Sequence, residues 1–453
     1  MNQAVRWSRL ALAAFLPLLL MGVTLLPTRP AGAVGCGPEP QLAAPVVQAQ
    51  ERWRYVYDGG GSYEMVGWTP TEATLLVNSP GCAISHVALV GLDLLSGAER
   101  WRVTYDQWQG EATDAATHSG LAILVTSDAV YAYDETTGQQ LWSVVHGYEG
   151  WPEILAIENN IVVLAADTGL AGVIVGTGAI AWQQMLPVGS VSDWANVNGG
   201  ALVALGRPDS AGQAVQAFGI DKATGTLLWQ TSVGNTTAST GGTLNLAGNG
   251  AGLIAAEVLT DATTSLVALD GVTGSILWTV PLANDGTYGR MYVTKGAQPA
   301  VVYGTGGSLD VKSATGYDAT TGAVRWQNAN IGADAMLADE THLVGAGPTL
   351  SYMNALVMVD GETGEMIWSQ YQALVDGAFP GSAHVFNGEV TFTPSSQEQP
   401  VPTVTVVDLA TGTVNWSMSY PEFTGLYVVG QAAGLVLAAG DTADEAVLMA
   451  LAS

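Results

Sequence analysis

The sequence predicts an all-β fold, a propeller built from four-stranded blades, and three observations lead to this prediction. A short pattern recurs eight times, its copies are spaced as propeller blades are, and the two ends of the repeat region complement each other. In the pattern an apolar stretch precedes Asp, three residues, Gly, three residues and Trp, and the tryptophans are Trp101, Trp142, Trp182, Trp229, Trp278, Trp326, Trp368 and Trp416. They lie 40 to 49 residues apart, which leaves room for four short strands in each unit.

Each copy of the pattern predicts a β-hairpin. The residues before Asp are apolar and often β-branched, as in 265–269, and predict a strand. Asp opens a turn in which its carboxylate accepts hydrogen bonds from turn amides, and Gly supplies the positive φ that closes the hairpin with a bulge. The Trp then lies on the returning strand and packs against the next unit. The copy that ends at Trp182 is degenerate, because Ile174 stands in place of Asp.

The two ends of the repeat region predict how the ring closes. After Trp416 three strands are predicted but no fourth, and they lie near residues 426–429, 434–439 and 445–452. Near the N-terminus the segment Glu51–Arg54 matches Glu99–Arg102 of the first copy. The strand at 52–57 is therefore expected to complete the last blade and to cover its open edge. The propeller then comprises residues 51–453.

The segment before the propeller is interpreted as an export signal, residues 1–33. Arg6 and Arg9 precede an apolar run at 10–27, and small residues that suit a cleavage site follow it. Residues 34–50 form a short tether. The chain is thus expected to be extracytoplasmic, either secreted or attached to the cell envelope.

Two alternatives to cleavage remain open, and they involve the apolar run and one of the two cysteines. Residues 10–27 are near the lower length limit for a membrane anchor, and Cys36 ends a segment that loosely resembles a lipoprotein box. In an exported protein Cys36 and Cys82 also suggest a disulfide, which would close a loop of about 45 residues. A lipid on Cys36 and this disulfide exclude each other.

The composition limits the classes of partner. The formal net charge is -27, with 40 acidic and 13 basic residues, so binding to nucleic acid is not expected. Charged residues make up only 12% of the chain, but apolar residues make up 48%, so the low charge does not indicate disorder.

The repeated Asp-x-x-Thr-Gly-x-x-x-Trp pattern resembles the repeat of the PQQ-like, or quinoprotein-type, β-propellers, and the resemblance extends over residues 51–453. It implies a propeller that usually has eight blades, so eight blades are expected here, with one irregular terminal unit. Eight copies and one closing unit nevertheless make nine, and nine blades stay open. The family includes quinone-dependent alcohol and sugar dehydrogenases, a non-catalytic lipoprotein of outer-membrane barrel assembly, and sensor domains.

The resemblance to dehydrogenases carries no catalytic residue over to this chain. Such enzymes typically hold the quinone against a disulfide between adjacent cysteines, beside calcium, whereas Cys36 and Cys82 are 46 positions apart. The repeat Asp residues are expected to cap turns rather than to bind calcium, and the five histidines have no metal-ligand spacing. No catalytic, cofactor-binding or metal-binding residue is therefore predicted, and no cofactor.

Four further tryptophans form the candidate ligand-binding aromatics, namely Trp68, Trp108, Trp151 and Trp194. Each follows a repeat-type Trp by 7 to 15 residues, a position expected in the connection between one blade and the next. Such connections share one face of a propeller, where exposed aromatic side chains suit a peptide or a glycan. The alternative is that they pack within the first strand of each blade.

These features together predict a non-catalytic scaffold outside the cytoplasm that binds a protein or an envelope polymer through one propeller face. Contact with a membrane is expected only through residues 10–27 or a lipid on Cys36. The first alternative is a quinone-dependent dehydrogenase of alcohols or sugars, which the family resemblance implies. The second is an envelope sensor domain, which would need residues 10–27 as its membrane segment.

Overall fold

The structure is a computed structural model in which the chain divides into two units, residues 1–45 and 46–453. All described residues belong to the second unit, and they are 50–57, 62–79, 86–106, 112–148, 150–166, 169–188, 190–197, 200–207, 214–235, 245–248, 252–259, 264–282, 288–306, 312–328, 331, 336–337, 339–348, 354–370, 379–395, 401–442 and 445–452. Within these ranges no helix has the length and apolar character needed to cross a membrane.

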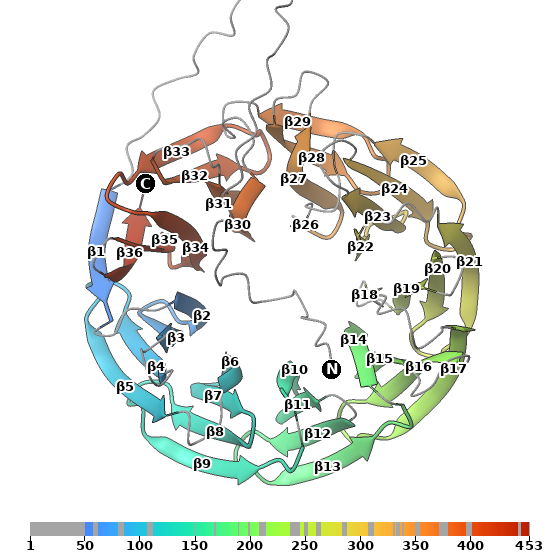
Figure 1. The fold of residues 1–453 in the computed structure, drawn as a ribbon, viewed down its shortest axis with the longest axis horizontal. Coiled ribbons are helices and arrows are strands. Elements are labelled where there is room, and N and C mark those ends of the chain that lie inside the picture. The colour runs from blue at the N-terminus through green and yellow to red at the C-terminus, as the bar shows by residue number, and fades with distance from the viewer. Residues whose placement is uncertain are drawn as a thin grey trace, which may run out of the picture. The chain divides into compact units, whose positions relative to one another are not determined.

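The described strands form nine antiparallel sheets of four strands, which follow one another as blades around a ring (Figure 1). Blade 1 is β2 (Ser62–Trp68), β3 (Glu72–Ser79), β4 (His86–Asp93) and β5 (Glu99–Asp106); blade 2 is β6 (Ala112–His118), β7 (Leu121–Thr126), β8 (Ala129–Asp134) and β9 (Gln140–Val145); blade 3 is β10 (Glu153–Glu158), β11 (Ile161–Ala166), β12 (Gly169–Ile174) and β13 (Ile180–Met185).

The next three blades continue in the same order. Blade 4 is β14 (Ser190–Val197), β15 (Ala201–Arg207), β16 (Ala214–Asp221) and β17 (Leu227–Asn235); blade 5 is β18 (Asn245–Gly248), β19 (Leu253–Leu259), β20 (Thr264–Asp270) and β21 (Ile276–Leu282); blade 6 is β22 (Tyr288–Val293), β23 (Ala300–Gly306), β24 (Lys312–Asp318) and β25 (Val324–Asn328).

The last three blades include the one that joins the two ends of the propeller. Blade 7 is β26 (Met336–Leu337), β27 (His342–Pro348), β28 (Asn354–Asp360) and β29 (Met366–Gln370); blade 8 is β30 (Phe379–Phe386), β31 (Glu389–Ser395), β32 (Thr403–Asp408) and β33 (Val414–Ser419); blade 9 is β34 (Gly425–Ala432), β35 (Leu435–Asp441), β36 (Ala446–Ala452) and β1 (Gln50–Val56). In each blade the first strand in this order is innermost and the fourth is outermost (Figure 1).

The expectation of eight blades is wrong, because the structure has nine. Each of the eight hairpin copies is completed by two strands of its own, including the first, where β2 and β3 precede the hairpin β4–β5. The closing sheet is a ninth blade rather than an irregular part of another. Counting repeats in this sequence gives the correct number, and the usual count in related propellers does not.

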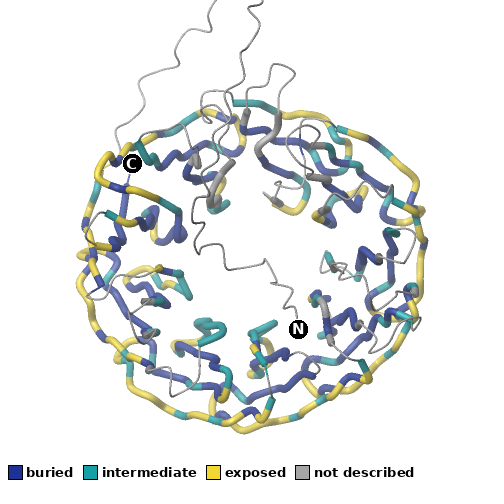
Figure 2. The backbone as a smooth tube through the Cα atoms, in the orientation of Figure 1, coloured by how far each residue is buried: buried dark blue, intermediate teal, exposed yellow. Residues whose placement is uncertain are grey.

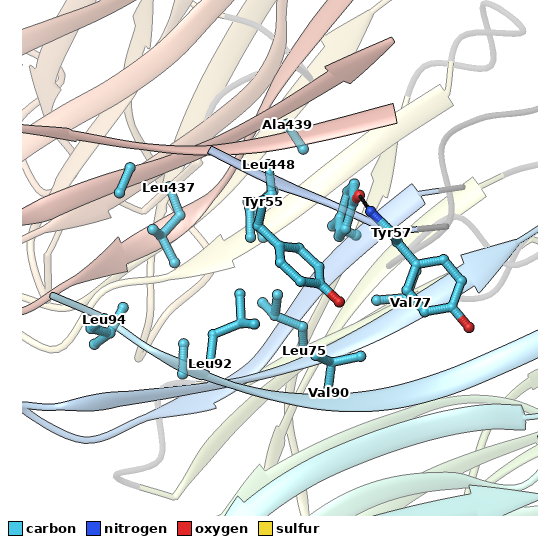
Figure 3. Close-up of a cluster of buried hydrophobic side chains, with 14 of the residues drawn as sticks. Tyr55, Tyr57, Leu75, Val77, Val90, Leu92, Leu94, Leu437, Ala439 and Leu448 are labelled. Atoms are coloured by element: carbon cyan, nitrogen blue, oxygen red, sulfur yellow. Dashed lines mark hydrogen bonds between the residues drawn. The ribbon is translucent and has the colours of Figure 1, made fainter. Parts of the chain in front are cut away.

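The predicted ring closure is confirmed, because β1 pairs antiparallel with β36 as the outer strand of blade 9. Tyr55 pairs with Leu448 in this ladder, and the Trp53 indole N–H donates to the Leu94 carbonyl of blade 1 at 2.8 Å. Apolar side chains from blades 9 and 1, among them Leu437 and Leu92, form the buried layer between these blades (Figure 3). The N-terminal strand thus ties the last blade to the first.

The repeat Trp connects neighbouring blades, as the sequence predicts. In seven outer strands, that of β1 included, its indole N–H donates over 2.7 to 3.2 Å to the carbonyl of the residue after the Asp position in the next blade. The turn glycine beneath the ring has a positive φ, as at Gly138 (φ 68°), and a Cβ there would lie 2.9 Å from Cδ2 of Trp101. Trp416 faces blade 9, whose outer strands are not joined by this turn, and packs with Tyr420 and Phe423 instead.

The repeat Asp residues adopt the predicted role in the turns. The Asp134 carboxylate accepts hydrogen bonds from the backbone N–H groups of Thr136 and Thr137 at 3.1 and 2.9 Å, and from both hydroxyl groups. These hydroxyls are the main reason why the pKa of Asp134 is lower than usual. The middle strands of the blades are mostly buried, while the outer strands expose many residues (Figure 2). The fold is therefore stabilised mainly between blades.

Candidate functional site

The candidate aromatics differ in how far they are buried and in where they lie relative to the innermost strand of their blade. Trp151 lies in the connection between β9 and β10, two residues before β10, and its side chain is 52% exposed. Trp68 is the last residue of β2, is 36% exposed and meets Phe386 of β30 edge to face, with ring centroids 5.6 Å apart. Trp194 lies within β14 and is half-buried against the apolar layer between blades 3 and 4.

The predicted aromatic patch is therefore not assembled from these three residues. Trp68 is the last residue of the innermost strand of its blade and Trp151 precedes that of another, so they lie at opposite ends of strands that run in the same direction. Placement in an inter-blade connection holds for Trp151 and is wrong for Trp68 and Trp194, which are in strands. Trp108, Cys36 and Cys82 lie outside the described residues.

The connection that carries Trp151 is fixed to blade 2 by two consecutive side chains of β6. The Thr113 hydroxyl donates to the Pro152 carbonyl. The Asp114 carboxylate accepts the Ile154 N–H at 2.8 Å and the N–H of Ala115, also at 2.8 Å. The β6–β7 ladder has a bulge between Ala112 and Asp114, which turns both side chains toward the next blade. The backbone on the C-terminal side of Trp151 is thereby held on both its carbonyl and its amide.

The other half of the connection is held by the His146 ring. Its Nδ1 accepts the N–H of Tyr148 at 3.1 Å, so Nε2 carries the hydrogen and donates to the Thr126 carbonyl at 3.1 Å. The His146 carbonyl in turn accepts the Gln183 side-chain N–H of blade 3 at 2.9 Å. The ring is buried at 1% exposure and stacks on Tyr148. These bonds give His146 a structural role in shaping the connection.

Tyr148 completes the attachment to blade 3. Its hydroxyl donates to the Leu170 carbonyl, and burial raises the pKa of this phenol. Between Tyr148 and Pro152 the chain turns at Gly150, whose φ of 102° is a conformation that disfavours side chains. Trp151 is therefore an exposed indole on a backbone that both neighbouring blades hold in place, which is the arrangement that a rigid binding contact requires.

Two parts of this site could not be recognised by the spacing of tryptophans alone. The Thr113-Asp114 pair anchors the connection from 37 or more positions away in the sequence, and only the bulge explains its direction. A local signal for Trp151 did exist, because Gly150 and Pro152 flank it and both interrupt a strand. A glycine, Gly67, also precedes Trp68, yet both residues belong to β2, so this signal alone does not separate the two positions.

The described residues contain no group of three or more His, Cys, Asp or Glu side chains that could hold a metal ion. The repeat Asp carboxylates that would be the nearest candidates are occupied by turn amides, as at Asp270, which accepts the N–H of Thr273 at 2.7 Å. The site at Trp151 offers an exposed aromatic surface.

A family model described as outer membrane protein assembly factor BamB matches residues 86–245 and 212–451. The chain belongs to this family. The matched residues extend from β4 through β36, so family membership rests on most of the propeller rather than on one repeat.

Solved structures resemble the chain at low identity. A eukaryotic initiation factor superposes with a TM-score of 0.54 at 10% identity, over 84% of this chain and 90% of that one. BamB from Moraxella catarrhalis gives 0.46 at 15% identity, over 76% and 96%, and a quinohemoprotein alcohol dehydrogenase from Pseudomonas putida HK5 gives 0.46 at 12%, over 89% and 76%. These likenesses concern the fold alone. No curated protein matches the sequence.

Proposed function

We propose that this chain is an exported, non-catalytic scaffold of the cell envelope that binds a protein partner through the face of the propeller bearing the inter-blade connections. The observation that carries the proposal is Trp151, a 52% exposed indole on a connection fixed from both sides. Family membership supports it, because the family is described as an outer membrane protein assembly factor. Residues 1–33 are proposed to direct the export.

The geometry suits binding because the backbone around Trp151 is already ordered before a partner binds. Fixing a side chain and its loop at an interface costs about 0.5–1.5 kcal/mol for each immobilised group. The bonds from Thr113, Asp114 and His146 have already fixed the backbone around Trp151 in the free protein. Large aromatic side chains in such places contribute strongly to protein interfaces. A scaffold that binds a partner without catalysing a reaction needs such an ordered and exposed aromatic contact.

The proposal is tested against the dehydrogenase alternative by adding pyrroloquinoline quinone and calcium to the purified exported chain. The scaffold proposal expects no heat of quinone binding in calorimetry and no substrate-dependent dye reduction with alcohols or sugars. Tight quinone binding with dye reduction would contradict the scaffold proposal and identify the chain as a dehydrogenase.

The second arm of the test captures partners from the cell envelope on the immobilised chain, with the Trp151→Ala variant as the matched control. The proposal expects a protein that the wild-type chain retains in stoichiometric amount. Retention of a polysaccharide and of no protein would contradict it. Mapping the mature N-terminus in the same preparation decides between cleavage, lipid on Cys36 and a retained segment at 10–27.

A further inference from the structure

The basic residues are distributed unevenly along the propeller. From residue 103 to residue 206 the sequence contains no Lys or Arg and eleven Asp and Glu. This stretch includes all of blades 2 and 3 and half of blade 4. Four of the arginines lie instead on β1 and β5, where three of them pair with carboxylates, such as Arg54 with Glu51 and Arg102 with Glu99, both at 2.6 Å. Glu158 of blade 3 is paired with Lys222 of blade 4 at 2.7 Å, but the stretch as a whole is strongly net negative.

Trp151 lies in the middle of this stretch, between blades 2 and 3. The turn from β7 to β8 lies at the same end of blade 2 as the connection from β9 to β10, because neighbouring strands are antiparallel. The two segments meet at Thr126: its carbonyl accepts the His146 ring, and its hydroxyl accepts the Asp128 N–H at 3.3 Å. Asp128 is exposed in that turn. An exposed indole and an exposed carboxylate thus belong to the same fixed face.

We infer that the partner segment that docks at Trp151 is cationic, an extended stretch of a protein with Arg or Lys side chains, one of which stacks on the exposed indole face. The inference rests on the proposed function and adds the chemistry of the partner. A guanidinium or ammonium group is attracted to the face of Trp, and Arg also stacks on it. The negative charge of blades 2 and 3 attracts such a segment over a distance and repels an acidic one.

The charge of the site decides between the possible occupants. An anionic envelope polymer would be repelled by the exposed Asp128 and by the net negative charge of residues 103–206, a stretch of the sequence without Lys or Arg. A neutral glycan can stack on Trp151 but gains nothing from that charge. A cationic segment gains from both features, and the fixed connection presents the indole without a further ordering cost.

The test uses the purified exported chain and a short peptide of alternating Arg and Gly, with matched peptides that carry Gln or Glu in place of Arg. Calorimetry at low and physiological salt should show binding of the Arg peptide that weakens with salt, weaker binding of the Gln peptide and none of the Glu peptide. Trp151→Ala should weaken binding of the Arg peptide by about two- to fivefold, and Trp151→Phe by less. Asp128→Asn should reduce the salt dependence.

Trp68→Ala is the matched control, since Trp68 is also an exposed indole but lies at the other end of its strand. It should leave the affinity for the Arg peptide unchanged. Equal affinity for the Arg and Gln peptides, unchanged affinity in Trp151→Ala, or no binding of the Arg peptide would each overturn the inference.

The natural partner separates this inference from the proposed function. If Trp151→Ala captures that partner with wild-type affinity, the cationic docking site is wrong and the scaffold stands. If the chain binds quinone and reduces dye, the scaffold itself is wrong, whatever the peptides show.

Discussion

Replacing Gly322 by Ala tests why the repeat turn needs glycine. Gly322 has a φ of 71°, and a Cβ there would lie 2.7 Å from Cδ2 of Trp278 in the preceding blade. The left-handed conformation costs a residue with a Cβ about 1–2 kcal/mol. Displacing the buried Trp278 ring, which is 8% exposed, adds about 1–3 kcal/mol for an overpacked contact. The free energy of unfolding should therefore fall by about 2–5 kcal/mol.

Gly388→Ala is the matched control, because Gly388 has a φ of 77° and nothing within 4 Å of the position of a Cβ. This variant should lose only the conformational part, about 1–2 kcal/mol. Urea unfolding followed by near-ultraviolet circular dichroism measures both variants. The same loss at Gly322 and Gly388 would refute the reasoning, since the contact with Trp278 would then contribute nothing.

Three further changes test the closure, the turns and the site. Trp53→Ala should cost about 3–5 kcal/mol of unfolding free energy, because the ring is buried between blades 9 and 1, whereas the exposed Trp151→Ala should change it by less than about 0.5 kcal/mol in the same urea titration. Arg325 donates to Asp318 and lowers the pKa of this carboxyl from 3.8 to about 2, so the stability that the pair contributes is present above pH 4 and lost as the pH falls from 4 to 2. Asp318→Asn should therefore flatten the pH dependence of the urea midpoint between pH 4 and pH 2. An unchanged curve would show that the pair contributes nothing. Asp114→Ala removes the acceptor of the Ile154 N–H and should speed hydrogen exchange of that amide by about tenfold or more, while unchanged exchange would mean that the connection is held without it.

The parts of the fold that sequence could predict are those that arise within one hairpin. The turn at Asp134 depends on residues two and three positions further on, and the strand before it on apolar alternation. Both signals are local, so they are visible in the sequence without a partner. The same holds for the closing strand, because residues 51–54 repeat the residues that surround Trp101.

The parts that sequence could not predict depend on where one blade meets another. The spacing of the tryptophans does not tell whether Trp68 ends a strand or lies in a connection, because the distance from the preceding repeat Trp varies from blade to blade. Trp68 follows Trp53 by 15 positions and ends β2, whereas Trp151 follows Trp142 by 9 and precedes β10. The exposure of Trp68 likewise depends on a neighbouring blade, because Phe386 of blade 8 contacts its ring in a T-shaped arrangement.

The outer strands show which positions are free to differ without changing the fold. In all nine outer strands of the described propeller, the residue before the repeat Trp lies at a β-bulge, as Arg100, Leu228 and Ile367 do. A bulge interrupts an edge and so protects it from pairing with another strand, whatever side chain it carries. This residue points away from the packed Trp, and Leu228 is 50% and Ile367 44% exposed. Because the backbone already protects the edge, charge is not required there, and the outer surface can change from Arg in blade 1 to Leu in blade 4 on an unchanged blade.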